Sequence, residues 1–269
     1  MPSIEQNKKR WNTYYDWKDK GNEWSSSWGG VDIQWYGTIL PRIHRFIPTG
    51  TILEIAPGYG RWTEFLKEYC EQLIIVDLSE KCIEECQKRF SSCSNITYLV
   101  NDGKSLDMIA DESIDFVFSF DSLVHAEKEV INSYLQQLST KLTKNGVGFI
   151  HHSNLGEYSN YYSLLGKILR PLPRGKEFLR RKYQITDNPH WRESSMTAKN
   201  FEQYAKDTNL QCINQEIINW GSKNLIDCLS TFTKNNSKWK SNNRIMRNNK
   251  FMREAKYLKE LSKLYGNRC

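Results

Sequence analysis

Short apolar runs alternate with amphipathic stretches through the first part of the chain. The apolar runs occupy residues 51–56, 72–78, 96–100, 114–120 and 147–152, and the stretches with helical periodicity occupy residues 61–70, 80–90 and 126–143. Strands of this length that are separated by single helices are typical of a parallel sheet covered on both faces. The pattern therefore predicts an α/β fold built on a doubly wound, mostly parallel sheet.

The alternation is interrupted after residue 152. Residues 153–195 are polar, aromatic and basic, and they are too many for an ordinary connection between a strand and a helix, so we predict an inserted cap that covers a substrate site. A helical pattern resumes at 196–208, followed by strand patterns at 210–218 and 225–233. The short polar break between these strands predicts an antiparallel hairpin, which would end a seven-stranded sheet.

We predict that residues 51–152 form a cofactor-binding, Rossmann-like core and that residues 196–233 form the last helix and hairpin of this core. Two further segments, residues 1–50 and 234–269, flank it. Residues 1–50 contain five of the nine tryptophans. Rings at that density are unfavourable in water, so we expect a helical segment that packs over the sheet edge, closes a pocket as a lid, or does both. Residues 234–269 are rich in Lys, Arg and Asn, from which we predict a basic tail that is helical or partly mobile.

The net charge of +7 is unevenly distributed. Residues 1–166 hold 16 Lys and Arg against 22 Asp and Glu, whereas residues 167–192 hold 8 against 2 and residues 234–269 hold 11 against 2. Proteins that coat nucleic acid usually spread their basic residues over the fold itself, so this distribution disfavours a nucleic-acid partner. No apolar run approaches the roughly 18 residues of a spanning helix, and the first residues lack the apolar core of a secretory signal.

The seven cysteines include no CxxC pair, which favours reduced thiols in a cytoplasmic protein. Cys82 and Cys86 are four residues apart, but no second pair or nearby histidine completes a zinc site. Asp121 and His125 likewise have no third ligand at a suitable spacing, so we predict no metal site. The sequence carries no signal for an oligomeric state.

The run from Glu54 to Gly60 places two glycines at the end of the first predicted strand. Glycines there let the backbone turn sharply and approach a ligand, but the third glycine of the dinucleotide fingerprint and the GK[ST] of a phosphate cradle are both missing. Asp77 ends the next strand, where an acidic side chain can accept both hydroxyls of a ribose. Asp102 and Gly103 follow the third strand. All these residues fall at the carboxyl edge of the predicted sheet, which predicts a nucleoside-containing ligand.

The stretches ILEIAPGYG, IIVDLS, NDG and DFVFSFDSLVH resemble the motifs of the class I S-adenosylmethionine-dependent methyltransferases, over roughly residues 50–155. A domain of the NAD-binding type is the main competitor. The resemblance implies S-adenosylmethionine as cofactor, with the glycines beside its methionine part, an acid at its ribose and an acid at its adenine. The implied cofactor-binding residues are Glu54, Gly58, Gly60, Arg61, Asp77, Leu78, Asp102, Gly103, Phe120 and Asp121.

Within that set the expected roles differ. Glu54 would support the glycine loop or the cofactor's amino group, and Arg61 would either contact the cofactor carboxylate or merely begin a helix. Asp77 would hold the ribose and Asp102 would meet the adenine, although each could instead serve its own turn. Phe120 and Asp121 would line the floor of the pocket.

Three histidines fall at the ends of the fourth and fifth predicted strands, namely His125, His151 and His152. A histidine beside the transferred methyl group could take a hydroxyl proton from the acceptor. Side chains alternate along a strand, so His151 and His152 should point to opposite faces. We predict His125 as the first choice of base and His152 as the second. Each could equally be a hydrogen-bonded residue of the pocket wall, and an already ionised acceptor would need no base.

The predicted acceptor is a small polar molecule. The fourth-strand motif is FDSL, not the Asn/Asp-Pro-Pro-aromatic motif of enzymes that methylate exocyclic amines of nucleobases. The cap predicts acceptor-binding residues, for which we name Tyr158, Tyr162, Arg174 and Arg181. Arginine clusters suit phosphate or carboxylate groups, which favours an anionic acceptor, although the cluster could also be a solvated helix face or a membrane-surface patch.

The best prediction of activity is O-methylation in surface-glycan or secondary-metabolite biosynthesis. The alternatives are an RNA methyltransferase and a non-catalytic scaffold with a methyltransferase fold.

Overall fold

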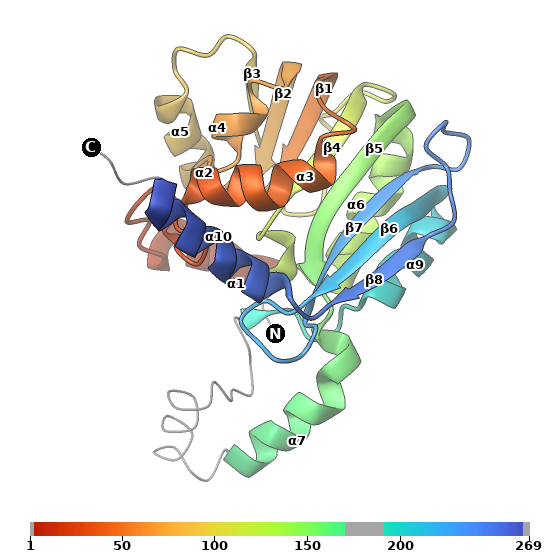
Figure 1. Cartoon of the computed structure of the whole chain (residues 1–269). Coiled ribbons are helices and arrows are strands. Elements are labelled where there is room, and N and C mark those ends of the chain that lie inside the picture. The colour runs from red at the N-terminus through yellow and green to blue at the C-terminus, as the bar shows by residue number, and fades with distance from the viewer. Residues whose placement is uncertain (1–2, 170–190, 266–269) are drawn as a thin grey trace.

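A computed structural model describes residues 3–169 and 191–265 of the chain. Within these residues one sheet of eight strands runs in the order β3-β2-β1-β4-β5-β7-β6-β8 (Figure 1). The strands are β1 Thr49–Ile55, β2 Cys70–Asp77, β3 Ile96–Val100, β4 Ile114–Ser119, β5 Leu142–Ser153, β6 Leu210–Ile218, β7 Asp227–Lys234 and β8 Arg244–Asn248. Strand β7 alone is antiparallel to its neighbours. The predicted α/β class and the antiparallel last hairpin are confirmed, but the described sheet has eight strands where seven were predicted.

The additional strand lies in the segment predicted as a tail. Strand β8 runs parallel to β6 and covers its outer edge, where Asn248 Nδ2 donates to Glu216 Oε1 at 2.8 Å. Four of its five residues are exposed, so the strand lacks the alternation of apolar and polar residues that marks a half-buried strand. Strand β8 forms instead because its backbone pairs with the edge of β6, which would otherwise be left open.

Successive side chains of the central strands point to opposite faces of the sheet and pack into two separate hydrophobic cores. Ile52 and Phe116 belong to one core, and Leu53 and Val117 to the other. The first core is covered by helices α2 Val31–Gln34, α3 Leu40–Ile43, α4 Thr63–Leu66, α5 Glu80–Arg89 and α10 Phe251–Tyr265, and the second by α6 Lys128–Lys141 and α9 Ala198–Asp207. This is the doubly wound arrangement in which ligands bind at the carboxyl edge of the strands.

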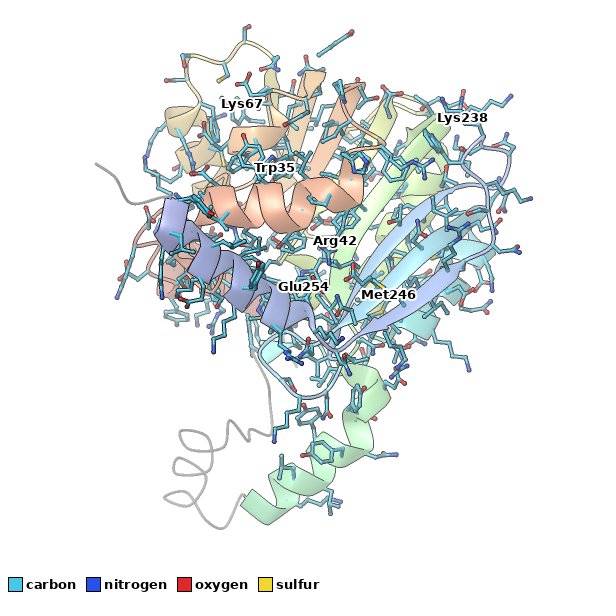
Figure 2. All side chains as sticks on the ribbon, in the orientation of Figure 1. Trp35, Arg42, Lys67, Lys238, Met246 and Glu254 are labelled. Carbon is cyan, nitrogen blue, oxygen red and sulfur yellow. The ribbon has the colours of Figure 1, made fainter. Side chains whose placement is uncertain are left out.

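Residues 3–47 divide into two parts with different surroundings. Trp28 and Trp35 are buried in the first core, where helix α10 packs along α2 and α3 (Figure 1). Arg42 of α3 joins strand β6 and helix α10 to this layer, since it pairs with Glu216 of β6 at 2.6 Å and faces Glu254 of α10 at 3.6 Å (Figure 2). The earlier part, which includes α1 Ile4–Lys9, instead lines a pocket at the carboxyl ends of the strands.

The segment predicted as a cap begins with helix α7 Ser159–Leu169, which projects away from the sheet (Figure 1). Tyr161 and Leu164 on this helix are exposed. Within the described ranges, no helix combines the length and the apolar character needed to cross a membrane.

Candidate functional site

The loop after β1 is shaped by backbone that only small or special residues adopt easily. Ala56, Gly58 and Gly60 all have left-handed backbone, with φ of 59°, 58° and 81°. A Cβ atom on Gly60 would lie 2.5 Å from the ring of Phe90, so glycine is needed there for packing. Gly58 lines the pocket, whereas Gly60 is buried against Phe90 and is not part of the lining.

Glu54, at the end of β1, supports this loop from beneath. Its carboxyl group is buried, and its Oε2 accepts a hydrogen bond from Thr63 Oγ1 at 2.6 Å. Burial raises the pKa of Glu54 to about 8, so the group is mostly protonated at neutral pH. Of its two predicted roles, the structure shows the support of the loop, because Glu54 does not line the pocket.

Asp77 ends β2 beside the glycine loop and faces the pocket together with Leu78. Its carboxylate accepts from the backbone N–H groups of Gly58 at 3.2 Å and Ser79 at 2.9 Å. Burial raises the pKa of Asp77 to about 6, although these N–H groups lower it. The carboxylate is therefore held in place by backbone N–H groups, and no cation among the described residues pairs with it.

Asp102 does not reach the pocket, which corrects the role expected for it. Its side chain is exposed, and its Oδ1 accepts from the backbone N–H groups of Lys104 at 3.0 Å and Ser105 at 2.7 Å. An aspartate that stabilises its own turn in this way is common. Gly103 does line the pocket, and its N–H donates to the buried Asn101 Oδ1 at 3.0 Å.

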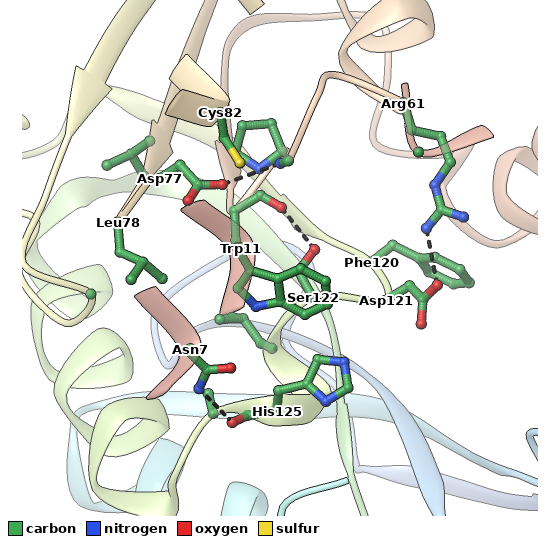
Figure 3. Close-up of a pocket in the computed structure, with 18 of the residues that line it drawn as sticks. Asn7, Trp11, Arg61, Asp77, Leu78, Cys82, Phe120, Asp121, Ser122 and His125 are labelled. Carbon is green, nitrogen blue, oxygen red and sulfur yellow. Dashed lines mark hydrogen bonds and ion pairs between the residues drawn. The ribbon is translucent and has the colours of Figure 1, made fainter. Parts of the chain in front are cut away.

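The pocket at this edge has a volume of about 1060 Å³, including its open mouth. Its floor is formed by the loops after β1, β2 and β4, and its roof by residues 4–24 (Figure 3). The roof contributes Ile4, Asn7, Trp11, Trp17, Gly21 and Trp24. Trp17 stacks on Tyr59 with 4.4 Å between ring centres, so the aromatic segment is packed directly on the glycine loop.

Known proteins resemble this chain in sequence and in fold. A family model described as a methyltransferase domain matches residues 52–146. The fold is similar to that of the PH0226 protein of Pyrococcus horikoshii, with a TM-score of 0.58 and 18% identity over 84% of this chain and 99% of that one. An S-adenosylmethionine-dependent methyltransferase from Clostridium acetobutylicum gives a TM-score of 0.51 and 15% identity over 78% of this chain and 92% of that one.

Residues 52–146 are a class I methyltransferase domain. The predicted family is confirmed, and so is S-adenosylmethionine as the cofactor of this domain. A shorter match is 34% identical over 59 residues to ribosomal RNA small subunit methyltransferase A of Coxiella burnetii. That match spans 22% of this chain and 23% of the relative's length.

The described residues of the methyltransferase domain fit the cofactor. A Cβ atom on Gly58 would lie 2.8 Å from the ring of Trp17, so glycine is needed there for the roof to pack on the loop, and Asp77 offers a carboxylate to ribose hydroxyls. Two buried polar atoms of lining residues, Arg61 Nη1 and Asn7 Oδ1, have no hydrogen-bond partner within the described part of the chain. Such atoms are rare in folded proteins unless a ligand or water meets them.

His125 lies in the wall of the pocket, between the rings of Trp11 and Trp191. Its Nδ1 is 2.8 Å from the carbonyl oxygen of Trp191. Because a carbonyl oxygen can only accept, Nδ1 carries the proton and Nε2 keeps a free lone pair. Burial and the nearby Arg192 lower the pKa of His125 to about 4, so the ring is neutral at neutral pH.

His152 lies on the opposite face of the sheet and is corrected as a candidate base. Its ring stacks on Phe201 of α9 at 4.4 Å between centres. Nδ1 contacts the carbonyl oxygen of Ser153 and Nε2 contacts Ser230 Oγ, both at 2.8 Å. With both nitrogens engaged and burial lowering its pKa to about 3, His152 is a core residue.

A buried charge network that the sequence did not reveal lies under the far end of the pocket. Asp121 pairs with Arg61 at 3.0 Å and lies 3.6 Å from Arg192. Arg192 in turn binds Asp227 through Nε at 3.0 Å and Nη2 at 2.9 Å. Burial would raise the pKa of Asp227, but Arg192 and His151 lower it to about 2.

His151 joins this network to the pocket floor. Its Nδ1 accepts from the backbone N–H of Asp121 at 3.1 Å, and its Nε2 lies 3.3 Å from Asp227 Oδ2. Asp121 has left-handed backbone with φ of 65°, a conformation that is often found at functional sites. Phe120 and Asp121 both line the pocket, as does Arg61.

The residues predicted to bind the acceptor are not brought to the pocket. Tyr162 Oη lies 3.2 Å from Ser222 Oγ, and Tyr158 Oη accepts from the backbone N–H of Leu225 at 3.4 Å. Both tyrosines thus attach the start of the predicted cap to the loop between β6 and β7. Arg174 and Arg181 lie outside the described residues. Among the described residues, no cluster of three or more His, Cys, Asp and Glu side chains could hold a metal ion.

Proposed function

We propose that this chain transfers a methyl group from S-adenosylmethionine to a hydroxyl of a small polar molecule. The observation that carries the proposal is His125, whose free Nε2 lies in the wall of a pocket that the aromatic segment of residues 4–24 roofs. A pocket roofed by aromatic side chains suits a small acceptor beside the cofactor. Acceptors of surface-glycan or secondary-metabolite biosynthesis are the class predicted from the sequence.

The chain's own residues supply three contributions to such a reaction. When bound, S-adenosylmethionine supplies a methyl group activated by the positive charge on its sulfur. The aromatic roof excludes water, and the pocket walls hold the acceptor in line with the methyl group. His125 Nε2 accepts the hydrogen bond of the acceptor hydroxyl and takes its proton as the new oxygen–carbon bond forms.

The charge of the acceptor also belongs to this proposal. Arg61 is buried in the lining with Nη1 unpartnered within the described residues. A guanidinium nitrogen in that position suits a carboxylate or phosphate group, supplied by the acceptor or by the methionine part of the cofactor.

The proposal is tested by following the radiolabelled methyl group of S-adenosylmethionine. The protein is incubated with a cell extract divided into a small-molecule ultrafiltrate and an RNA fraction. We expect label in the ultrafiltrate, and much less of it with the His125→Gln variant. Label confined to RNA would establish the RNA methyltransferase alternative, which the 59-residue similarity favours. Calorimetry that shows cofactor binding without transfer to either fraction would favour the scaffold.

A further inference from the structure

The two ends of the pocket suit the two ends of the cofactor. Arg61 and Asp121 form a charged end, whereas the apolar side chain of Leu78 lies at the other end (Figure 3). S-adenosylmethionine has a charged amino-acid group at one end and a flat purine at the other. Because Asp77 between them suits the ribose, the charged end takes the amino-acid group and the apolar end takes the adenine.

One buried polar atom of a lining residue at this end has no hydrogen-bond partner among the described residues. Asn7 is 8% exposed, and its Nδ2 donates to the carbonyl oxygen of His125 at 3.1 Å. That carbonyl can only accept, so the amide cannot be reversed, and Oδ1 is the atom left over. Asn7 lines the pocket, and its buried Oδ1 has no hydrogen-bond partner among the described residues.

Asp102, the residue expected to meet the adenine, does not line the pocket. Its side chain is exposed, and its Oδ1 already accepts from two backbone N–H groups. The exocyclic amino group of adenine is a hydrogen-bond donor. It therefore needs an acceptor from another part of the chain.

We propose that Asn7 Oδ1 accepts a hydrogen bond from the exocyclic amino group of the cofactor's adenine. The proposal rests on S-adenosylmethionine being the cofactor. It makes the N-terminal helix α1 part of the cofactor site and gives the site a means of telling adenine from purines that lack this donor. Asn7 also ties the roof to the loop after β4 through His125, so adenine recognition and closure of the roof share one side chain.

The test measures the ratio of the affinities for two ligands, because a variant that weakens the binding of both ligands equally leaves this ratio unchanged. Calorimetry compares S-adenosylhomocysteine with its analogue that carries hydrogen in place of the amino group, for the wild type, Asn7→Leu and Asp102→Ala. An ordinary hydrogen bond is worth about a fivefold difference in affinity. We expect the wild type and Asp102→Ala to prefer S-adenosylhomocysteine about fivefold and Asn7→Leu to show no preference.

Two results would overturn the proposal in distinguishable ways. If Asn7→Leu keeps the preference, or if Asp102→Ala loses it, Asn7 does not recognise the adenine. The assignment of S-adenosylmethionine as cofactor would still stand. A wild-type protein that binds neither ligand removes the cofactor assignment itself. Asn12→Ala serves as the matched control, because Asn12 also anchors the roof, to Glu80 at 3.3 Å, but does not line the pocket, and it should keep the preference.

Discussion

Two buried aspartates at the same edge of the sheet are held in opposite electrostatic states. Asp77, at the cofactor end, has backbone N–H groups beside it but no cation, and burial raises its pKa to about 6. Asp227, under the far end, is equally buried, yet Arg192 and His151 lower its pKa to about 2. A buried charge that lacks a cation is poised for a ligand, whereas one that is fully paired belongs to the framework.

The two shifts affect stability in opposite directions. Asp77 has a folded-state pKa above the value near 3.8 expected for an unfolded chain, so its contribution favours the folded state at low pH and is lost as the pH rises through about 6. The pKa of Asp227 is lowered, so its contribution is present at neutral pH and is lost as the pH falls toward about 2. Each shift of roughly two units corresponds to about 3 kcal/mol.

The largest expected effect is on the paired aspartate. Asp227→Asn would remove the negative charge that pairs with Arg192 at 2.9 Å, and breaking a buried pair in this way typically lowers the free energy of unfolding by about 3–5 kcal/mol. Urea denaturation measures this loss. Asp77→Asn is the matched control, since it removes a buried charge that has no cation and should not lower stability. Equal stability of both variants would remove the distinction between the two aspartates.

The next largest effect distinguishes His125 from His152 by whether a substitution changes kcat or the free energy of unfolding. His125→Gln should lower kcat about a hundredfold, which is at the low end for loss of a general base, with little change in the free energy of unfolding. His152→Ala should instead lower that free energy by about 2 kcal/mol, because it removes a ring stacked in the core and two hydrogen bonds, and should leave kcat unchanged. Both are measured once an acceptor is known, and a fall in kcat with His152→Ala alone would reverse the assignment.

The smallest expected effect is the pH dependence of cofactor binding. Ionised Asp77 accepts ribose hydroxyls better than the protonated acid does, so affinity for S-adenosylhomocysteine should rise with pH through about 6. If only the ionised form binds well, the affinity at pH 5 should be about tenfold weaker than at pH 7.5. Calorimetry at the two pH values measures this change. The Asp77→Asn variant should show none, and a wild type with a flat profile would contradict the role of Asp77.

The cofactor end of the pocket was largely predictable from the sequence because each contact comes from a short run at a strand end. Gly58, Asp77 and Phe120 all follow apolar strands in this way. Asp102 fits the same pattern, but a carboxylate that binds its own turn looks identical in sequence to one that meets a ligand. His152 shows a similar limit, since alternation predicts that neighbouring histidines face apart without telling which of them faces the pocket.

The polar contacts of the far end and of the roof could not be predicted, because they join single polar residues from distant segments. Arg192 and Asp227 are 35 residues apart, and Asn7 is 118 residues from the histidine whose carbonyl it binds. A lone polar residue has no periodicity, and only the tertiary fold gives it partners. The signal that existed was Asp227 itself, an acid between the apolar residues Ile226 and Cys228, which indicates a buried partner.

The packing of α10 on the N-terminal layer bears on how the chain is completed during synthesis. Lys259 Nζ of this helix donates to the carbonyl oxygen of Ser26 at 2.7 Å, and Phe251 packs edge-on against Trp28. Ser26 and Trp28 therefore acquire their final neighbours only when helix α10, much later in the chain, emerges from the ribosome. Until then the indole of Trp28 has an incomplete covering, and the growing chain carries an exposed apolar surface of the kind that chaperones bind.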